Sequence, residues 1–457
     1  MQININFIPK TPKTYLVGGT VRDMILGIPP KDYDLVTLDD PRQTAGRIAE
    51  SIAGRVVVLG KPGKMVFRVI TRGLSLDITP ASGASIEEDL KKRDFTVNAL
   101  AVSISSGRFI DLFNGALDLE NKIIRMISPD NLRADPIRLL RAYRLAAVLN
   151  FSIDPETCRS IGAESSRIST SAGERVRDEL MKLLDTSGAH HYLSLMDDAG
   201  LLTAIFPELS PLKSCSQNGY HQFDVFEHTM QASRYLEKLL HTPGLIPGRH
   251  PLKEIQPHEN RWSLLKYAIL LHDIGKPQTR SVDQNGRVHF YHHDQESADM
   301  ARKVHQRFRL SNRQQTYVDF IIRHHLKPLS LFTAFQKSKL SHKAITRFFL
   351  KCNDLSTDLF IHAIADIFGK GVPENASAFM EFAGLMCRTY SGTFVPMTKH
   401  PRLLNGDDLI REFGLSPSPL FSKILRHVEE ARFSQTIRTR EDALRVVKNF
   451  LILNNRS

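Results

Sequence analysis

The sequence predicts an α+β fold in which a small sheet domain comes first and helices form the rest of the chain. Short apolar or alternating runs typical of strands lie within the first 125 residues, among them VVVLG, KMVFRVIT and LSLDITPA. From ADPIRLLRAYRLA onward, apolar residues recur at the three- and four-residue spacing of amphipathic helices. A chain of 457 residues has room for several domains. We expect four parts, at residues 1–125, 126–210, 211–390 and 391–457.

The composition is that of an ordinary globular protein and favours a polyanionic partner. Hydrophobic residues make up 42% and charged residues 24% of the chain. No apolar run reaches the roughly 18 residues that a membrane span needs. The first residues lack the apolar core of a signal peptide, so we expect a cytoplasmic protein without a membrane partner. The net charge of +12 suggests nucleic acid, and four cysteines without a CxxC pair predict neither disulfides nor thiolate zinc.

One stretch, residues 15–37 (YLVGGTVRDMILGIPPKDYDLVT), organises the first domain. An apolar run ends in Gly18 and Gly19, and Thr20 is placed to cap the short helix that follows. A glycine and two prolines then break this helix. The sequence DYD leads into a second strand-like run, so the stretch reads as strand, helix and strand.

Two carboxylates and two glycines in this stretch predict a metal ion beside a phosphate. Residues two apart on a strand point to the same side, so Asp32 and Asp34 are expected to aim at one point. Like charges held together favour a cation between them, and oxygen-only ligands suit Mg²⁺. Gly18 and Gly19 leave backbone N–H groups free at a helix start, where a phosphate can rest, and Arg22 adds a positive charge. This equipment fits phosphoryl or nucleotidyl transfer, whereas a lone DxD is usually a solvated turn.

Two further polar groups lie in the same domain. Asp77 falls inside the predicted strand LSLDITPA, and it is either a third carboxylate that faces the first two or a strand-edge aspartate. In RDFTVNALAVS, Arg93 and Asp94 precede a phenylalanine, and Asn98 follows one helical turn later. This spacing indicates a positioned polar cluster. The alternative interpretation is a plain amphipathic helix with solvated charges.

These motifs resemble those of a known family. GGTVRD, DYD, RDFTVNAL and ADPIRLLRAYRLA are similar, in this order, to motifs of the class II tRNA nucleotidyltransferases and bacterial poly(A) polymerases. The resemblance implies a polymerase-beta-type head followed by a helical neck, body and tail. It implies that Asp32 and Asp34 carry metal ions; Asp77 stays a candidate third catalytic carboxylate on the strand pattern alone. It also implies the residues that hold the triphosphate and ribose of the incoming nucleotide: Gly18, Gly19, Arg22, Arg93, Asp94 and Asn98.

The neck is expected to read the base of the incoming nucleotide. Arg138, Arg141 and Arg144 are spaced three apart and share one face of a helix, which is either a solvated basic face or a nucleotide-binding one. The resemblance implies that Asp135 and Arg138 meet the base of CTP or ATP, because aspartate only accepts hydrogen bonds and arginine only donates them. Members of the family usually have a glutamate before this aspartate, where this chain has Ala134.

A short connection precedes the arginine motif at residue 93. Relatives that build the whole CCA end tend to have a long loop here, whereas this chain has only ASGASIEEDLKK. The short connection resembles the CC-adding type, which stops before the terminal A. Further on, GERVRDELMKLL resembles a neck motif in which Glu174 and Arg175 are expected to tie helices together.

After residue 210 the chain becomes rich in histidines, and its motifs resemble the HD phosphohydrolase superfamily. The motifs are VFEHTM, LLHDIGKP, FYHHDQE, IIRHHLKP and HAIADIFG. The resemblance implies four metal ligands: His228, His272, Asp273 and Asp366. His293, with His324 or His325, would complete a second metal position. Imidazole with carboxylate suits Mn²⁺, Fe²⁺, Ni²⁺ or Zn²⁺ better than Mg²⁺. Lys276 either assists a phosphate or caps a helix.

The favoured hypothesis is a template-independent nucleotidyltransferase that adds C, A or both to the 3′ end of tRNA. It would use CTP and ATP with two metal ions, and the HD-like part would add phosphohydrolase activity on RNA ends. A poly(A) polymerase is the alternative within the family. A second alternative is an RNA-binding HD phosphohydrolase with an inactive head, although the intact DxD argues against it. The basic helices at the end of the chain are expected to follow tRNA phosphates.

Overall fold

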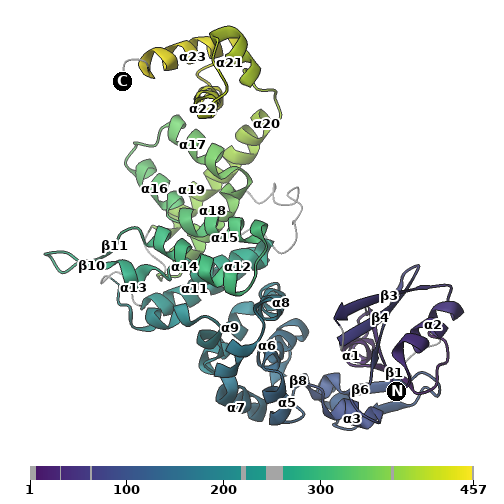
Figure 1. The fold of residues 1–457 in the computed structure, drawn as a ribbon. Coiled ribbons are helices and arrows are strands. Elements are labelled where there is room, and N and C mark those ends of the chain that lie inside the picture. Colours follow the sequence, from purple (N-terminus) through teal and green to yellow (C-terminus); the bar gives the residue numbers. More distant parts are fainter. Residues whose placement is uncertain are drawn as a thin grey trace. The chain divides into compact units, whose positions relative to one another are not determined.

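The computed structural model describes residues 7–30, 32–61, 64–217, 223–242, 261–371 and 375–454. The chain divides into two compact units, Met1–Pro207 and Glu208–Ser457. The first unit holds the large sheet and the second is mostly helical, so the predicted α+β fold class is confirmed (Figure 1). No helix in these described ranges is long and apolar enough to cross a membrane. The four-part division of the chain stays a prediction.

A seven-stranded sheet forms the head of the first unit, with strand order β3-β4-β5-β2-β1-β6-β7. The strands are β1 (Thr14–Val17), β2 (Tyr33–Thr37), β3 (Arg55–Lys61), β4 (Lys64–Thr71), β5 (Leu74–Pro80), β6 (Leu100–Ser103) and β7 (Phe109–Asp111). In this sheet β2 pairs with β5 in parallel, and the other neighbours pair antiparallel. The crossover from β2 to β5 passes through helix α2 (Pro41–Ser51) and the β3–β4 hairpin.

The register of three neighbouring strands places charged side chains on one face of the sheet. Asp34 on β2 lies opposite Asp77 on β5, and Asp77 lies opposite Arg68 on β4. Leu35 and Leu76, which point to the other face, are fully buried. A shift by one residue would exchange these two faces, so burial of the leucines fixes the position of the charges.

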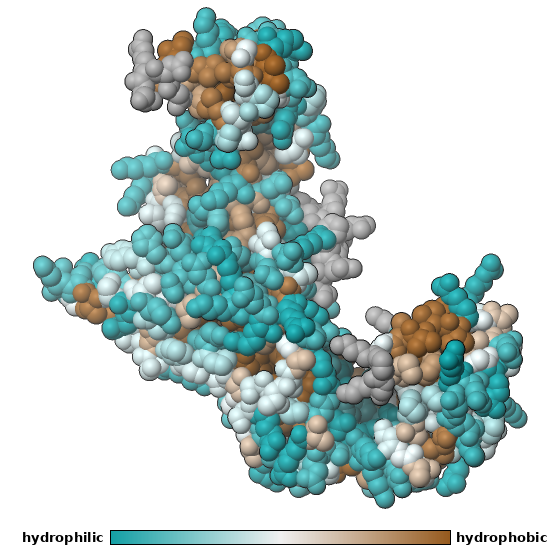
Figure 2. Space-filling model, in the orientation of Figure 1, coloured by the Kyte–Doolittle hydropathy of each residue, from teal (hydrophilic) through white to brown (hydrophobic). Residues whose placement is uncertain are grey.

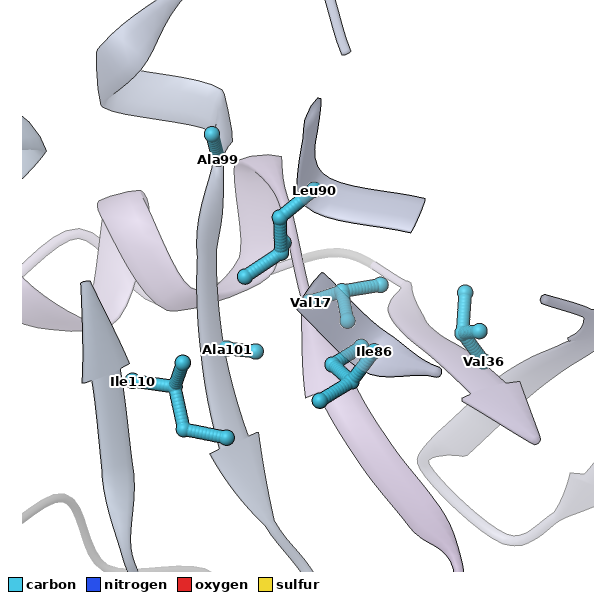
Figure 3. Packing of buried hydrophobic residues seen from close by; sticks show 7 residues of the cluster. All are labelled: Val17, Val36, Ile86, Leu90, Ala99, Ala101 and Ile110. Atoms are coloured by element: carbon cyan, nitrogen blue, oxygen red, sulfur yellow. The ribbon is translucent and has the colours of Figure 1, made fainter. Parts of the chain in front are cut away.

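Figure 3 shows the apolar cluster that packs helix α3 (Ile86–Lys91) against the sheet. The cluster consists of seven buried side chains: Val17, Val36, Ile86, Leu90, Ala99, Ala101 and Ile110. Ile86 and Leu90 are one helical turn apart and therefore lie on the same side of α3. Their burial fixes α3, and with it the polar segment that follows from Arg93 to Asn98.

The rest of the first unit is helical. The head also contains α1 (Gly19–Ile25), the 3-10 turn η1 (Thr96–Asn98) and α4 (Gly115–Glu120). The neck contains α5 (Pro129–Ala134), α6 (Ile137–Leu149), α7 (Pro155–Glu164), η2 (Ser165–Thr170), α8 (Gly173–Leu184), α9 (Ala189–Asp198) and α10 (Leu201–Ile205).

A short parallel pairing joins head and neck. Strand β8 (Ile123–Ile124) pairs with β9 (Ser152–Ile153). Arg125 forms ion pairs with Asp118 in α4, at 3.2 Å, and with Asp154, at 2.5 Å. Helix α6, which lies between these two strands in the sequence, is therefore held against the β8–β9 pair.

The second unit is built from helices and one hairpin. A 3-10 segment, η3 (Pro207–Ser214), leads into it. Its first part contains α11 (Val225–His241), α12 (Arg261–Leu271), α13 (Lys276–Thr279), β10 (Arg280–Val282), β11 (Val288–Phe290), α14 (His293–Arg307) and α15 (Asn312–His324). The middle contains α16 (Lys327–Gln336), α17 (His342–Cys352), η5 (Asn353–Leu355), α18 (Ser356–Phe368), α19 (Ala376–Thr389) and the π-helix η6 (Tyr390–Phe394). The end contains α20 (Val395–Thr398), α21 (Gly406–Phe413), α22 (Pro419–Phe433) and α23 (Arg440–Asn454).

The edge strand β3 leaves apolar side chains exposed, and Figure 2 shows brown apolar surface on the head. Val56, Val58 and Leu59 on β3 are 38%, 53% and 38% exposed, and Met65 on β4 is 42% exposed. Exposed apolar edge strands favour contact with another surface.

Candidate active site and metal centre

A cavity of about 1020 Å³ lies in the first unit between the head and the neck. Head residues on one wall include Gly19, Arg22, Asp32 and Asp34, which the sequence had placed at the nucleotide. Neck residues on the other wall include Arg144 and Lys182. A space of this size suits a nucleotide, and its walls combine acidic and basic groups as a bound metal–triphosphate would need.

The paired aspartates lie at the start of β2, beside α1. Asp34 is on β2 and Asp32 immediately precedes that strand, and both residues line the cavity. The prediction that Thr20 caps α1 is wrong. The N-cap position is occupied by Gly18, and Thr20 is already the second residue of the helix. The hydroxyl of Thr20 instead accepts a hydrogen bond of 2.9 Å from the backbone N–H of Asp34. Thr20 therefore connects the phosphate-facing helix to the acidic strand.

Asp77 is bound by a basic neighbour. Arg68 donates two hydrogen bonds of 2.7 Å to its two carboxylate oxygens, and the same guanidinium lies 3.8 Å from Asp32. Partial removal from water raises the pKa of Asp34, and the negative charges of Asp77 and Asp32 raise it further, against the cations Arg93 and Arg141. That Asp77 acts as a third catalytic carboxylate stays a prediction.

Two independent features favour glycine at position 18. Its φ of +68° lies in the left-handed region. A Cβ atom at Gly18 would also stand 2.6 Å from Nη1 of Arg93, which is anchored to Asp89 by hydrogen bonds of 3.0 and 2.9 Å. At Gly19 a Cβ would meet the guanidinium of Arg22 at 3.4 Å, a close but tolerable contact.

A chain of hydrogen bonds connects the predicted nucleotide-binding residues from head to neck. Arg22 donates to the side-chain oxygen of Asn98 at 2.7 Å, and Asn98 donates to Asp94 at 3.0 Å. Arg141 on α6 forms an ion pair with Asp94 at 2.9 Å. Burial alone would raise the pKa of Asp94, but Arg141 and the hydrogen bonds hold it below its ordinary value. Asp94 is thus an ionised link between the two walls.

The two residues expected to read the base are held by neck residues. Both oxygens of Asp135 accept hydrogen bonds from Arg175 on α8, at 2.8 and 2.7 Å. Arg138 donates to the backbone carbonyl of Asn131 at 3.0 Å. Neither Asp135 nor Arg138 is among the residues that line the cavity. Arg144, which does line it, is bound to Glu179 at 2.7 Å.

Four of the predicted HD-type ligands form a buried cluster in the second unit. They are His228 on α11, His272 and Asp273 after α12, and Asp366 on α18. His228 Nε2 lies 2.8 Å from Asp366 and 3.5 Å from Asp273, and His272 Nε2 lies 3.1 Å from Asp273. Such a set of imidazoles and carboxylates can hold a divalent metal ion.

A second cluster shares Asp273 with the first. Its ligand atoms come from Asp273, His293 at the start of α14 and His325 at the end of α15. Nε2 of His293 lies 3.3 Å from Asp273 Oδ1 and 3.3 Å from Nε2 of His325. The first cluster meets Asp273 through Oδ2. Of the two candidates left open by the sequence, His325 joins the cluster and His324 does not.

The histidines are oriented as metal ligands need to be. Nδ1 of His272, His293 and His325 lies 2.7–2.8 Å from the backbone carbonyl three residues earlier. A carbonyl only accepts, so each Nδ1 carries the proton and each Nε2 is directed at the carboxylates. Burial lowers the pKa of His272, but Asp273 and Asp366 raise it to about 9, so a metal ion would have to displace a proton there.

Lys276 completes this site without capping a helix. Its ammonium lies 2.6 Å from Asp273 and 3.0 Å from the side-chain oxygen of Gln217. The carboxylate of Asp273 thus contacts histidines of both clusters and the ammonium of Lys276. The pKa of Asp273 is held well below its ordinary value, because His272 and Lys276 outweigh the effect of burial.

Comparison with known proteins covers almost the whole chain. Family models described as a poly A polymerase head domain, a probable RNA and SrmB-binding site of polymerase A, and an HD domain match residues 14–125, 150–213 and 225–369. The A-adding tRNA nucleotidyltransferase of Deinococcus radiodurans is 32% identical over 450 residues, which cover 97% of this chain and 96% of that protein. This chain belongs to the tRNA nucleotidyltransferase family. The CC-adding tRNA nucleotidyltransferase of Thermus thermophilus is 31% identical over 441 residues, 95% of this chain and 93% of that protein.

Solved structures agree on the fold of this tRNA nucleotidyltransferase. The Thermotoga maritima CCA-adding enzyme, solved with tRNA, matches with a TM-score of 0.63 and 22% identity, covering 96% of this chain and 91% of that one. The nucleotidyltransferase head and the HD domain together imply that divalent metal ions are used.

Several residues of this tRNA nucleotidyltransferase site were not singled out from the sequence. Arg68 and Asn131 had no functional motif around them, Lys182 lies in the neck motif GERVRDELMKLL but was given no role, and Arg175 was assigned to helix packing alone. The alternation of β4 against β5 was the available signal for Arg68, because it places an arginine opposite Asp77. His362, one turn before Asp366, is also buried beside His272, with ring centres 5.1 Å apart.

Proposed function

We propose that this tRNA nucleotidyltransferase adds C to the 3′ end of tRNA from CTP and that it is of the CC-adding type. The observation that carries the nucleotidyl-transfer part is the cavity in which Asp32 and Asp34 face the cationic residues Arg22, Arg144 and Lys182. An RNA 3′-hydroxyl attacks the α-phosphate of the nucleotide in line, and pyrophosphate leaves. Asp32 and Asp34 would hold Mg²⁺, which lowers the pKa of that hydroxyl and offsets charge on the phosphates.

The residues of the chain position and neutralise the nucleotide. The backbone N–H of Gly19 begins α1 and suits a phosphate, because the positive end of the helix dipole is there. The N–H of Gly18, which the sequence also predicted to be free, instead donates to the backbone carbonyl of Leu100 at 3.0 Å. Arg22, held against Asn98, offers a guanidinium that is already oriented. Arg93 stands beside Gly18 and is fixed by Asp89. These groups are preorganised, which reduces the free energy needed to order them when the nucleotide binds.

Base selection is proposed to depend on Asp135 and Arg138, as the resemblance to the family implies, although both residues lie outside the lining of the cavity. Cytosine and adenine both carry an exocyclic amino donor next to a ring acceptor, and Asp135 accepts while Arg138 donates. Cytosine adds a second acceptor that a guanidinium can also reach. Uracil and guanine reverse this pattern and would leave both side chains mismatched. Arg175 keeps the carboxylate of Asp135 in one orientation.

The CC-adding assignment is supported by the connection between β5 and α3. It consists of residues 81–85 alone, and it is tied down at both ends. The backbone N–H of Ser82 donates to Asp89, and that of Ala84 donates to Glu88, both at 2.9 Å. A Cβ at Gly83 would clash with the side chain of Glu88. So short and anchored a segment has no length to rearrange between successive additions, which fits a single type of nucleotide.

A primer assay with purified tRNA tests the proposal. The full-length protein is incubated with tRNA that lacks CCA and with tRNA that ends in CC, and each receives labelled CTP or ATP separately. We expect two C residues on the first tRNA and no A on the second. Addition of A to tRNA ending in CC would refute the CC-adding type. Long A tails on any RNA would instead identify a poly(A) polymerase.

A second activity is proposed for the HD-type centre. The two ligand clusters joined by Asp273, with Lys276 beside them, suit hydrolysis of a phosphoester with Mn²⁺, Fe²⁺, Ni²⁺ or Zn²⁺. Proposed substrates are 2′,3′-cyclic or 2′-phosphate ends of RNA. Release of phosphate from 2′-AMP, measured with each metal and with the Asp34→Ala variant, tests this. If no metal supports hydrolysis, this second activity is refuted, whereas CTP addition is unaffected.

The basic helices at the C-terminal end of the chain are proposed to contact the tRNA backbone. Within this region α21, α22 and α23 pack around a common core that includes Leu409, Ile424 and Val447. Their outer faces carry arginines and lysines suited to phosphates. The cytoplasm is the proposed location, since tRNA and CTP are cytoplasmic molecules.

A further inference from the structure

A polar pocket of about 520 Å³ in the second unit is lined by none of the residues assigned above to nucleotidyl transfer or to the two metal clusters. It is built by the neighbours in sequence of two metal-cluster residues, since Asp294 follows His293 and His324 precedes His325. The lining residues are Asp294, Gln295, Arg323, His324, Leu326, Lys327, Ser330 and Lys351. Most of these side chains can donate hydrogen bonds, and a pocket of this kind suits an anion.

The charge of the pocket is positive and largely uncompensated. Lys327 and Lys351 form no ion pair with any carboxylate of the described ranges, whereas Arg323 is bound to Asp299 at 2.8 Å and to Asp319 at 3.3 Å. Among the residues that line the pocket, Asp294 carries the carboxylate. Two uncompensated ammonium groups outnumber it, so an anion would be attracted.

His324 supplies a second, independent observation. It is 8% exposed, lines the pocket, and neither ring nitrogen has a hydrogen-bond partner within the described part of the chain. Its ring stacks on Phe320 with centres 4.4 Å apart, which fixes its direction. An unsatisfied buried imidazole is costly, and a ligand that accepts a hydrogen bond would remove that cost.

Two helix ends add to the same potential. The first turn of α14 contributes Asp294 and Gln295, and the first turn of α16 contributes Lys327 and Ser330. The N-terminal end of a helix carries partial positive charge and favours anions. The C-terminal end of α15, which contributes Arg323 and His324, acts in the opposite sense, so the two lysines and the unpartnered imidazole carry the argument.

We propose that this pocket binds a phosphate group carried by a ribonucleotide or by an RNA strand. The volume exceeds what a phosphate ion alone would fill, so the phosphate belongs to a larger molecule. Two residues that line the pocket, Asp294 and His324, are next in sequence to the metal-cluster residues His293 and His325. An RNA strand whose end lies at the metal clusters can therefore place a neighbouring phosphate in the pocket. The inference goes beyond the proposed function, since binding here requires neither the head nor hydrolysis.

Calorimetric titration of the full-length protein tests this binding site. The probes are inorganic phosphate and uridine 3′-monophosphate, whose base the proposed reader in the head would reject. The test variant is Lys327→Gln/Lys351→Gln, and the control Lys303→Gln/Lys343→Gln removes two exposed lysines outside the pocket. We expect the test variant to bind uridine 3′-monophosphate at least about tenfold more weakly, because charge-assisted hydrogen bonds are lost. The control should match the wild type.

Two further measurements separate a binding effect from a folding effect. Asp294→Asn removes the opposing carboxylate and should tighten binding, which a damaged fold cannot do. CTP addition by the head should be equal in all variants and reports an intact protein. The proposal is overturned if the test variant keeps wild-type affinity, if the control loses as much, or if Asp294→Asn weakens binding. Equal affinity for both probes would identify free phosphate as the ligand and overturn the ribonucleotide part.

Discussion

Arg68 binds both oxygens of Asp77 at 2.7 Å and also stands 3.8 Å from Asp32. One guanidinium therefore lies between a strand-centre carboxylate and a proposed metal ligand. Because Asp77 raises the pKa of Asp34 while its own oxygens are engaged by Arg68, we expect Asp77 to act on the site through charge.

Asp77→Asn is expected to shift the pH dependence of CTP addition. The folded protein raises the pKa of Asp34, so activity that needs its ionised form falls as the pH drops through that raised pKa. Removing the charge of Asp77 lowers this pKa, and the acid limb should move to lower pH while activity at neutral pH persists. Initial rates across pH measure this. Exposed Glu120→Gln is the control, and complete inactivity would make Asp77 a metal carboxylate instead.

Asp32→Ala and Asp34→Ala should each reduce incorporation of labelled CTP at least about 10³-fold, because each removes a proposed metal carboxylate. Circular dichroism should show an unchanged fold, since both side chains face the cavity. Asp39→Asn, which also removes one carboxylate but lies outside the cavity lining, should keep its activity. Full activity in either alanine variant would end the proposal for the head.

Gly18→Ala and Gly19→Ala should differ although they change neighbouring residues. Alanine at position 18 has to adopt a φ near +68° and displace Arg93, so we expect a loss of about 1–2 kcal/mol in unfolding free energy and a higher KM for CTP. Alanine at position 19 needs no left-handed backbone, and its Cβ would meet only the flexible guanidinium of Arg22 at 3.4 Å, so we expect a smaller effect. Thermal unfolding and initial rates compare the two. Equal effects would show that the contact with Arg93 is unimportant.

Arg175→Lys should relax base selection without removing charge. Lysine cannot reproduce the two parallel hydrogen bonds that now hold Asp135, so the carboxylate gains freedom to rotate. We expect CTP addition to slow and misincorporation of UTP to rise, measured as the ratio of kcat/KM values. The matched control is Arg167→Lys, because Arg167 forms an exposed ion pair with Glu164, and it should change neither value.

Asp273→Ala should remove metal from both clusters of the HD-type centre at once, since each cluster uses one of its oxygens. Elemental analysis of the purified protein gives the metal content per chain. CTP addition should persist, because the head carries its own carboxylates. His400→Ala, at an exposed histidine outside both clusters, should retain the metal. Unchanged metal content in Asp273→Ala would contradict the assignment of this centre.

Two different signals in the sequence pointed to the site. Asp32 and Asp34 line one cavity, as a local period of two indicates. The HD-type ligands share no local period, and the resemblance of their motifs to the HD superfamily indicated the cluster that they form. Arg68 and Arg175 escaped notice because each acts across a pairing between segments distant in sequence. The choice between His324 and His325 depends on where α15 ends, which periodicity leaves uncertain by a residue or two.

Thr20 illustrates a different limit of sequence reasoning. A threonine after two glycines fits a helix cap by propensity, yet its hydroxyl has a partner on β2 that only the tertiary fold supplies. The hydrogen bond between α1 and β2 outweighs the local preference of threonine for a cap position.

The register between β2 and β5 also limits how the length of this chain can vary during evolution. Asp34 and Asp77 face one another only while both strands keep their spacing, so the insertion or deletion of one residue in either would invert the acidic face. Residues 81–85, which begin where β5 ends, are under no such constraint. Lineages can therefore lengthen or shorten that connection while the catalytic strands stay untouched, and under the CC-adding proposal such a change would alter which nucleotides are added.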